Sequence, residues 1–198
     1  MIRLLYKVPR EVTVACSGGV DSVALLHFLS LKHKVKAAFF HHGTENSDKA
    51  EDFVEKLCEK MNVKLEVGRI AENKPNGLSK EEHWRNCRYD YLSKFPYVVT
   101  AHNLDDVVET WVWSSLHGTP KLIPYERGNI RRPLLCTRKK HLVEWCTDHN
   151  VSWIEDLSNK DISYTRNFIR HEMMDDVLRV NPGIHKMLEK KLKEKIVL

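Results

Sequence analysis

The sequence predicts an α/β protein in which a parallel, twisted sheet is flanked by helices and followed by a C-terminal helical extension. Short β-branched runs alternate with longer segments of helical apolar spacing, which is the pattern of strands joined by crossover helices. The strand-like runs are apolar on both faces or nearly so, as buried parallel strands are. They cover residues 12–16, 35–40, 63–67 and 97–101.

The segments between the strands carry helix signals. Ser79 and Glu82 form a capping-box pattern that opens a helix to about Ser93, and Asn103 precedes a helix that Gly118 helps to end. Apolar residues also recur at helical spacing from residue 23 to 29 and from 50 to 61. The remaining predicted helices cover residues 138–149, 163–180 and 184–197.

The pattern becomes mostly helical after Pro133, so we expect residues 1–136 to form a nucleotide-binding domain and residues 137–198 a helical extension. No apolar run approaches the ~20 residues that cross a bilayer, and no basic-then-apolar signal segment opens the chain. The five cysteines form no CxxC pair, which favours reduced thiols. A cytoplasmic protein without membrane segments is therefore expected.

The charge of the chain is concentrated. The formal net charge is +5, and residues 121–145 alone contain seven basic residues against two acidic ones. A dense basic band fits a polyanionic partner such as nucleic acid, because Lys and Arg bind phosphates and release condensed counterions. The alternative is a solvated helix face.

A glycine-rich loop, SGGVDS, follows the first predicted strand and precedes an apolar helix. Strand, glycine loop and helix start together form an anion site, because backbone N–H groups and the helix dipole attract phosphate. No GK[ST] ending is present, and Asp21 stands where a lysine would be expected. An acid beside phosphates implies Mg²⁺, while the alternative is a tight capped turn. The predicted phosphate-binding residues, which the family resemblance given below implies bind ATP, are Ser17, Gly18, Gly19, Val20, Asp21 and Ser22.

A second candidate site is the acidic start of the helix after Asn103. Asp105 and Glu109 are four residues apart and Asp106 and Glu109 three apart, so each pair shares a helix face. Three acids in one place can hold a metal or an amine, although acids also favour a helix N-terminus through the dipole alone. Asp21 and Asp105 are the predicted Mg²⁺ ligands.

Several segments resemble one protein family. SGGVDS is similar to the SGGxDS motif of the PP-loop, or N-type ATP pyrophosphatase, superfamily, and AHNLDDVVET at 101–110 resembles the AHHLDDQAET-like segment of the tRNA(Ile)-lysidine synthetases. Residues 82–92, 131–135 and 153–170 resemble that family's ExxRxxRYxxL, RPLL and WxEDxSNxDxxYxRNxIR segments, in the same order. The resemblance implies a Rossmann-like ATP-binding fold.

The resemblance also implies a reaction. ATP would adenylate the wobble cytidine of an isoleucine tRNA with a CAU anticodon, and L-lysine would displace AMP after pyrophosphate has left. The expected catalytic residues are Asp21, Arg85, Asp105, Asp106 and Glu109, with ATP and Mg²⁺ as cofactors. The expected tRNA contacts are Arg88, Arg131, Arg132, Lys139, Lys140, Arg166 and Arg170.

Departures from the family leave alternatives open. Residues 42–45 read HGTE where the family has HGLR, and His117 stands where an arginine is usual. Many members carry further C-terminal domains, so this short form would select tRNA through its catalytic domain, through residues 138–198, or as a homodimer. The alternatives are a tRNA thiolase of the same superfamily, a small-molecule ligase and a non-catalytic RNA-binding module.

Overall fold

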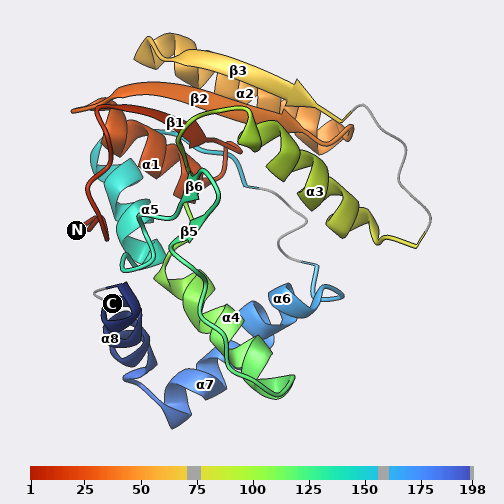
Figure 1. Cartoon of the computed structure of the whole chain (residues 1–198), viewed down its shortest axis with the longest axis vertical. Coiled ribbons are helices and arrows are strands. Elements are labelled where there is room, and N and C mark those ends of the chain that lie inside the picture. Colours follow the sequence, from red (N-terminus) through yellow and green to blue (C-terminus); the bar gives the residue numbers. More distant parts are fainter. Residues whose placement is uncertain (71–76, 156–160, 197–198) are drawn as a thin grey trace.

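The computed structural model describes residues 1–70, 77–155 and 161–196. Their strands form one six-stranded sheet in the order β3-β2-β1-β4-β6-β5 (Figure 1). All neighbouring strands are parallel except β5 and β6, which are antiparallel. The strands are β1 Glu11–Ala15, β2 Lys34–His41, β3 Lys64–Arg69, β4 Val98–Val99, β5 Glu126–Arg127 and β6 Ile130–Arg131.

The predicted fold class is confirmed, and each of the four predicted strands coincides with one of β1 to β4. The fourth is shorter than expected, because only Val98 and Val99 pair with their neighbours. The β5–β6 pair was not anticipated, since strands of two residues carry no periodicity that a sequence reveals.

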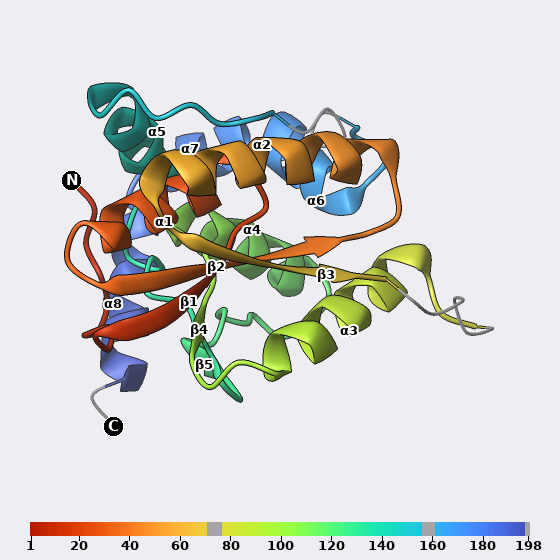
Figure 2. The ribbon, with the colours of Figure 1, turned by 90° about the horizontal axis from the view of Figure 1, so that it is seen from above.

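Helices cover both faces of the sheet. Helices α1 Val20–Ser30 and α2 Glu45–Met61 lie on one face and α3 Lys80–Ser93 lies on the other (Figure 2). The Ser79 cap is present, with its hydroxyl accepting from the Glu82 N–H at 3.1 Å. Helix α4, Leu104–Leu116, begins with a full capping box between Asn103 and Asp106.

The strand order creates a switch point between β1 and β4. The chain runs outward from β1 through β2 to β3, then returns to add β4 on the other side of β1. Val14 pairs with Val99, so the loops that follow these two parallel strands leave the same edge side by side. Such a point is where open α/β sheets bind ligands.

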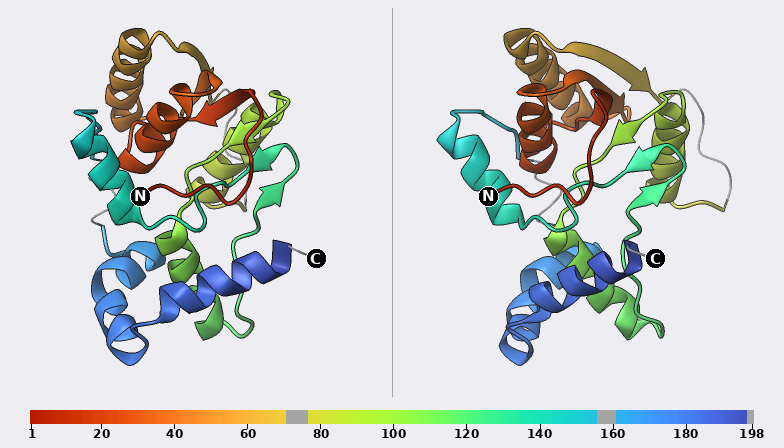
Figure 3. Two further views of the ribbon diagram at one scale, coloured as in Figure 1. Left: turned by 90° about the vertical axis from the view of Figure 1, so that its left-hand side faces the viewer. Right: turned by 60° about the vertical axis from the view of Figure 1, so that its left-hand side comes forward.

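The C-terminal third is helical and packs on the sheet domain. It contains α5 Lys139–Asp148, α6 Thr165–Phe168, a π-helical turn Ile169–Met173, α7 Met174–Val180 and α8 Ile184–Ile196. Helix α5 lies beside α1, and α8 lies beside α4 (Figure 3). Leu142 and Cys146 of α5 belong to the core that includes α1, and Leu188 and Leu192 of α8 to the core that includes α4. The division at residue 136 stays a prediction.

In this region one sequence prediction is only partly confirmed, and others fall on residues that the structure does not describe. The single helix expected over 163–180 is interrupted by the π-helical turn, which apolar spacing alone does not show. Residue 197, the predicted end of the last helix, and residues 156–160 of the 153–170 segment lie outside the described residues.

Helix α3 is fixed to the sheet by a glycine contact. The ring of Tyr91 lies directly on Gly68, where a Cβ atom would overlap it. The Tyr91 hydroxyl donates to the Glu66 carbonyl at 2.8 Å. Leu92 and Phe95 complete the apolar contact with the sheet. This anchoring sets the position of the basic face of α3.

Within the described residues, no helix has the length and apolar character that a membrane crossing requires.

Candidate active site

The SGGVDS loop connects β1 to α1 at the switch point. Gly19 is the N-cap of α1, and no described side chain caps the first turn. The N–H groups of this turn are therefore available to an anion. Ser22 braces the loop from inside: its hydroxyl accepts from the Ser17 N–H at 3.1 Å and donates to the Gly19 carbonyl at 2.9 Å. The exposed Ser17 hydroxyl lies 3.3 Å from that of Ser22.

The loop is also held from the C-terminal half of the chain. The Ile154 N–H donates to the Gly18 carbonyl at 3.0 Å. Gly18 has φ +85°, and a Cβ there would come within 3.0 Å of the Ile154 side chain. Both the backbone conformation and the space thus require glycine.

One carboxylate oxygen of Asp21 lacks a hydrogen-bond partner in the described part of the chain. This oxygen, Oδ1, is buried. Among the described residues, Lys139 is the one cation within 4.0 Å of this carboxylate, with Nζ 3.9 Å from Oδ2. Burial raises the pKa of Asp21 to about 6, against the opposing charge of Lys139, and Asp106 and Asp105 add to the rise. A carboxylate with a buried, unpaired oxygen beside an open anion site fits a Mg²⁺ ion shared with phosphate oxygens.

Asp106 and Glu109 lie on the same side of α4 and share two arginines. Arg170 binds both Glu109 oxygens, at 2.7 and 2.9 Å. Arg166 Nε lies 3.2 Å from Glu109 Oε2 and its Nη2 3.3 Å from Asp106 Oδ1. Arg170 also lies 3.5 Å from Asp106. The predicted tRNA contacts Arg166 and Arg170 thus pair with the predicted catalytic acids.

Asp105 takes different partners from Glu109, although the two are four residues apart. Its carboxylate accepts from Arg138 Nε at 3.1 and 3.2 Å, from the Lys139 N–H at 2.7 Å, and contacts His185 Nε2 at 3.3 Å. Burial would raise the pKa of Asp105, but these bonds outweigh burial and hold it at about 2. Asp105 thus connects α4 with α5 and α8. Of the two predicted metal ligands, Asp105 is bonded to protein groups, whereas Asp21 has an oxygen without a partner among the described residues.

The structure describes no group of three or more His, Cys, Asp or Glu side chains placed to hold a metal. A cation at Asp21 would therefore draw further ligands from the bound nucleotide, as Mg²⁺ commonly does with substrate phosphates.

Among the described residues, the remaining predicted site residues do not pair with the carboxylates of Asp21, Asp105, Asp106 or Glu109. Arg85 is exposed and contacts Tyr89 through its guanidinium, whose Nη2 is 3.4 Å from the phenol oxygen. Arg132 is 3% exposed and donates to the Pro124 carbonyl at 2.7 Å. Arg131 pairs with Glu126 at 3.1 Å. Arg88 is half-buried, and Lys140 is exposed.

The sequence analysis did not predict several contacts of the site. His102 precedes α4 and bonds Thr100 Oγ1 through Nδ1 at 2.9 Å. Burial, together with the charges of nearby arginines, lowers the pKa of His102 to about 3. His185 and Ile154 carry no local signal, because their roles arise from contacts with distant segments. Arg138 and Lys139 lie in the basic band, but nothing in their spacing indicates acid partners.

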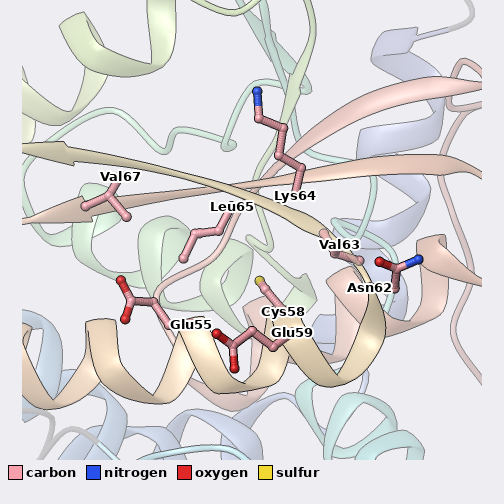
Figure 4. Close-up of a pocket in the computed structure, with 8 residues that line it drawn as sticks. All are labelled: Glu55, Cys58, Glu59, Asn62, Val63, Lys64, Leu65 and Val67. Atoms are coloured by element: carbon pink, nitrogen blue, oxygen red, sulfur yellow. The ribbon is translucent and has the colours of Figure 1, made fainter.

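A cavity of about 630 Å³ lies elsewhere, between the C-terminal half of α2 and β3 (Figure 4). Glu55 and Glu59 line it from the helix and Leu65 from the strand, whereas the Lys64 side chain points away from α2. None of the predicted site residues lines this cavity.

An uncapped phosphate loop and an acidic helix start at a sheet switch point define an α/β nucleotide-binding protein. The PP-loop domain family matches residues 3–177, so the chain belongs to this family.

The similar curated proteins share one name. A tRNA(Ile)-lysidine synthase of Thermotoga maritima is 33% identical over 193 residues, 88% of this chain and 47% of that protein. The one of Thermosipho africanus is 34% identical over 191 residues, covering 87% and 45%. The one of Bdellovibrio bacteriovorus is 32% identical over 197 residues, covering 90% and 61%. The chain spans about half the length of the first two relatives.

A solved structure described as a predicted subunit of tRNA methyltransferase from Methanocaldococcus jannaschii superimposes with a TM-score of 0.48 at 18% identity, covering 70% of this chain and 75% of that one.

Proposed function

We propose that this protein modifies tRNA by an ATP pyrophosphatase reaction, joining L-lysine to the wobble cytidine of an isoleucine tRNA through an adenylated base. The observation that carries the proposal is the free, buried oxygen of Asp21 beside the uncapped first turn of α1. The shared name of the relatives supports tRNA as the acceptor.

The loop supplies the nucleotide site. Backbone N–H groups of residues 17–22 would bind the phosphates of ATP, and Asp21 would hold Mg²⁺. The ion would supply charge neutralisation at the α-phosphate, where the bond to pyrophosphate breaks. Lys139 Nζ lies 3.9 Å from Asp21 Oδ2, so its positive charge would also offset the negative charge of phosphates bound beside Asp21.

The acids of α4 would receive the amine. Asp106 and Glu109 are occupied by Arg166 and Arg170. Arg166 is the weaker partner, since its side chain is 51% exposed and its bonds are 3.2 and 3.3 Å long. A lysine ammonium would take the place of Arg166 and lose a proton to a carboxylate before attacking C2 of the cytidine. Neutral His102 stands nearby as a further hydrogen-bonding group.

Four of the five cysteines give the rival thiolase reaction no support. Cys16, Cys58, Cys136 and Cys146 are buried, and burial raises the pKa of each thiol. A sulfur carrier needs an accessible thiolate.

The test is incubation of the protein with ATP, Mg²⁺, bulk tRNA and radiolabelled lysine, followed by counting of acid-precipitated tRNA. Label that resists mild base, unlike an ester-linked aminoacyl group, is expected. If pyrophosphate release depends on tRNA but the tRNA carries no label, adenylation of tRNA is supported and lysine is excluded as the amine. No ATP consumption with any tRNA would favour the non-catalytic RNA-binding module.

A further inference from the structure

Four arginines surround one tyrosine on the face of the sheet that carries α3. The guanidinium carbons of Arg85 and Arg127 lie 4.8 and 4.7 Å from the ring centroid of Tyr89, and that of Arg88 lies 5.8 Å away. Arg132 Nη2 donates to the Tyr89 hydroxyl at 3.2 Å. These four, called the arginine cluster below, come from α3, β5 and the residue after β6.

The arginine cluster has an unbalanced charge. Among the described residues, none of its four guanidiniums lies within 4.0 Å of a carboxylate. Arg132 is only 3% exposed, and its Nε has no hydrogen-bond partner among the described residues. Burial lowers the pKa of Arg88, and neighbouring Arg85 and Arg132 lower it further. Four mutually repelling cations are stabilised when an anion binds between them, and planar guanidinium groups suit phosphate.

An aromatic surface adjoins the cluster. Trp84 lies one helical turn before Arg88 on α3, with Lys80 Nζ 4.6 Å from its ring. Its ring packs on that of His42 with centroids 5.2 Å apart. His42 Nδ1 is buried without a hydrogen-bond partner in the described part of the chain. Aromatic rings beside arginines are the combination that holds unstacked bases and their phosphates.

The cluster also adjoins the candidate active site. The charges of Arg85, Arg88 and Arg132 act on His102, and so does the charge of Arg166. Arg166 in turn binds Glu109 at 3.2 Å. The arginine cluster and the arginine that binds Glu109 thus act on the same imidazole.

We propose that α3 and the β5–β6 hairpin form a surface for single-stranded RNA, on which the arginine cluster binds a backbone phosphate and Trp84 stacks on a base. The assignment rests on the proposed function, since it gives the loop of the tRNA substrate its binding surface. It adds Trp84 and Arg127 to the expected RNA contacts and reassigns Arg85 from catalysis to RNA binding.

The test is binding of a fluorescein-labelled anticodon stem–loop RNA with the sequence CAU, measured by anisotropy over a range of salt. Arg85→Ala combined with Arg127→Ala removes two exposed charges and is expected to weaken binding roughly tenfold and to reduce the salt slope by about 1. Trp84→Ala is expected to weaken binding roughly tenfold at an unchanged slope, and Trp84→Phe to restore most of it.

The matched control removes the same charge from the other face of the sheet. Lys49 and Lys60 are exposed on α2, and the variant carrying alanine at both is expected to bind as the wild type does. Circular dichroism melts of all variants verify folding. Because phosphate is common to RNA and ATP, binding of a fluorescent ATP analogue is measured in parallel.

Two results would overturn the proposal: RNA binding by the Arg85/Arg127 variant equal to that of the wild type, or loss of ATP-analogue binding with RNA binding retained. The proposed function fails separately. A wild-type protein that binds the stem–loop through this surface yet transfers no lysine would refute lysine ligation and leave the RNA surface in place.

Discussion

Arg170 and Glu109 form a bidentate pair, with Nε and Nη2 of the arginine donating to the two carboxylate oxygens at 2.7 and 2.9 Å. The residues are 61 positions apart in the sequence. Glu109 is 4% exposed, so its charge has little access to water. The pair therefore fastens the π-helical turn to the acidic helix.

Replacing Arg170 by alanine is expected to lower the free energy of unfolding by about 2–3 kcal/mol. Loss of one partner of a buried pair costs about 3–5 kcal/mol, and Arg166 would still offset part of the Glu109 charge. Urea denaturation measures the change. Arg179→Ala is the control, because the Arg179–Asp176 pair is exposed and such pairs contribute at most about 1 kcal/mol. Equal effects of the two substitutions would contradict this role of Arg170.

Asp21→Asn is expected to increase stability at pH 8 in buffer without magnesium, while abolishing tRNA-dependent pyrophosphate release. The pKa of Asp21 rises from its ordinary 3.8 to about 6 in the fold, so the folded state holds the extra proton between these values. Stability therefore falls as pH rises through that window, and asparagine removes this loss. The two proteins should converge below pH 4 in urea titrations. A variant less stable than the wild type at pH 8 would contradict the prediction.

His102 gives a pH dependence of the opposite sign. Its pKa falls from 6.5 to about 3 in the fold, so the unfolded chain takes up the proton first as pH falls. Stability is therefore lost as pH decreases from about 7 towards 4. In His102→Gln this contribution is absent, and urea midpoints should fall less steeply over the range. Ring signals of His102 that titrate near pH 6.5 in NMR spectra would refute the assignment.

Gly68→Ala is expected to cost about 1–3 kcal/mol, as overpacking of a filled contact does. The new Cβ would overlap the Tyr91 ring, and α3 would have to move from the sheet. Gly183→Ala is the comparison, because a Cβ there meets its nearest described atom, Asn181 Oδ1, at 3.5 Å. Thermal unfolding distinguishes them, and equal melting temperatures for the two variants would show that α3 adjusts freely.

The sequence predicts the parts of the site that local patterns encode. Apolar strands, the SGGVDS loop and the Ser79 and Asn103 caps each depend on neighbouring residues. The order of the strands, which creates the switch point between β1 and β4, depends on long-range pairing that no local pattern shows. Helical spacing could not show that Asp105 turns to Arg138 and His185 while Glu109 turns to Arg166 and Arg170. Charge patterning likewise could not show that Arg132 is buried, because burial depends on how the β5–β6 hairpin packs on Tyr89.

The bond from the Ile154 N–H to the Gly18 carbonyl bears on how the protein is made. Chains emerge from the ribosome N-terminal end first, so the nucleotide loop is synthesised long before the residue that clamps it. A nascent chain carrying the whole SGGVDS sequence would still lack the conformation that suits phosphate. The nascent chain would then become able to bind nucleotide only late in translation, after Ile154 has been synthesised. Incomplete chains would not bind ATP.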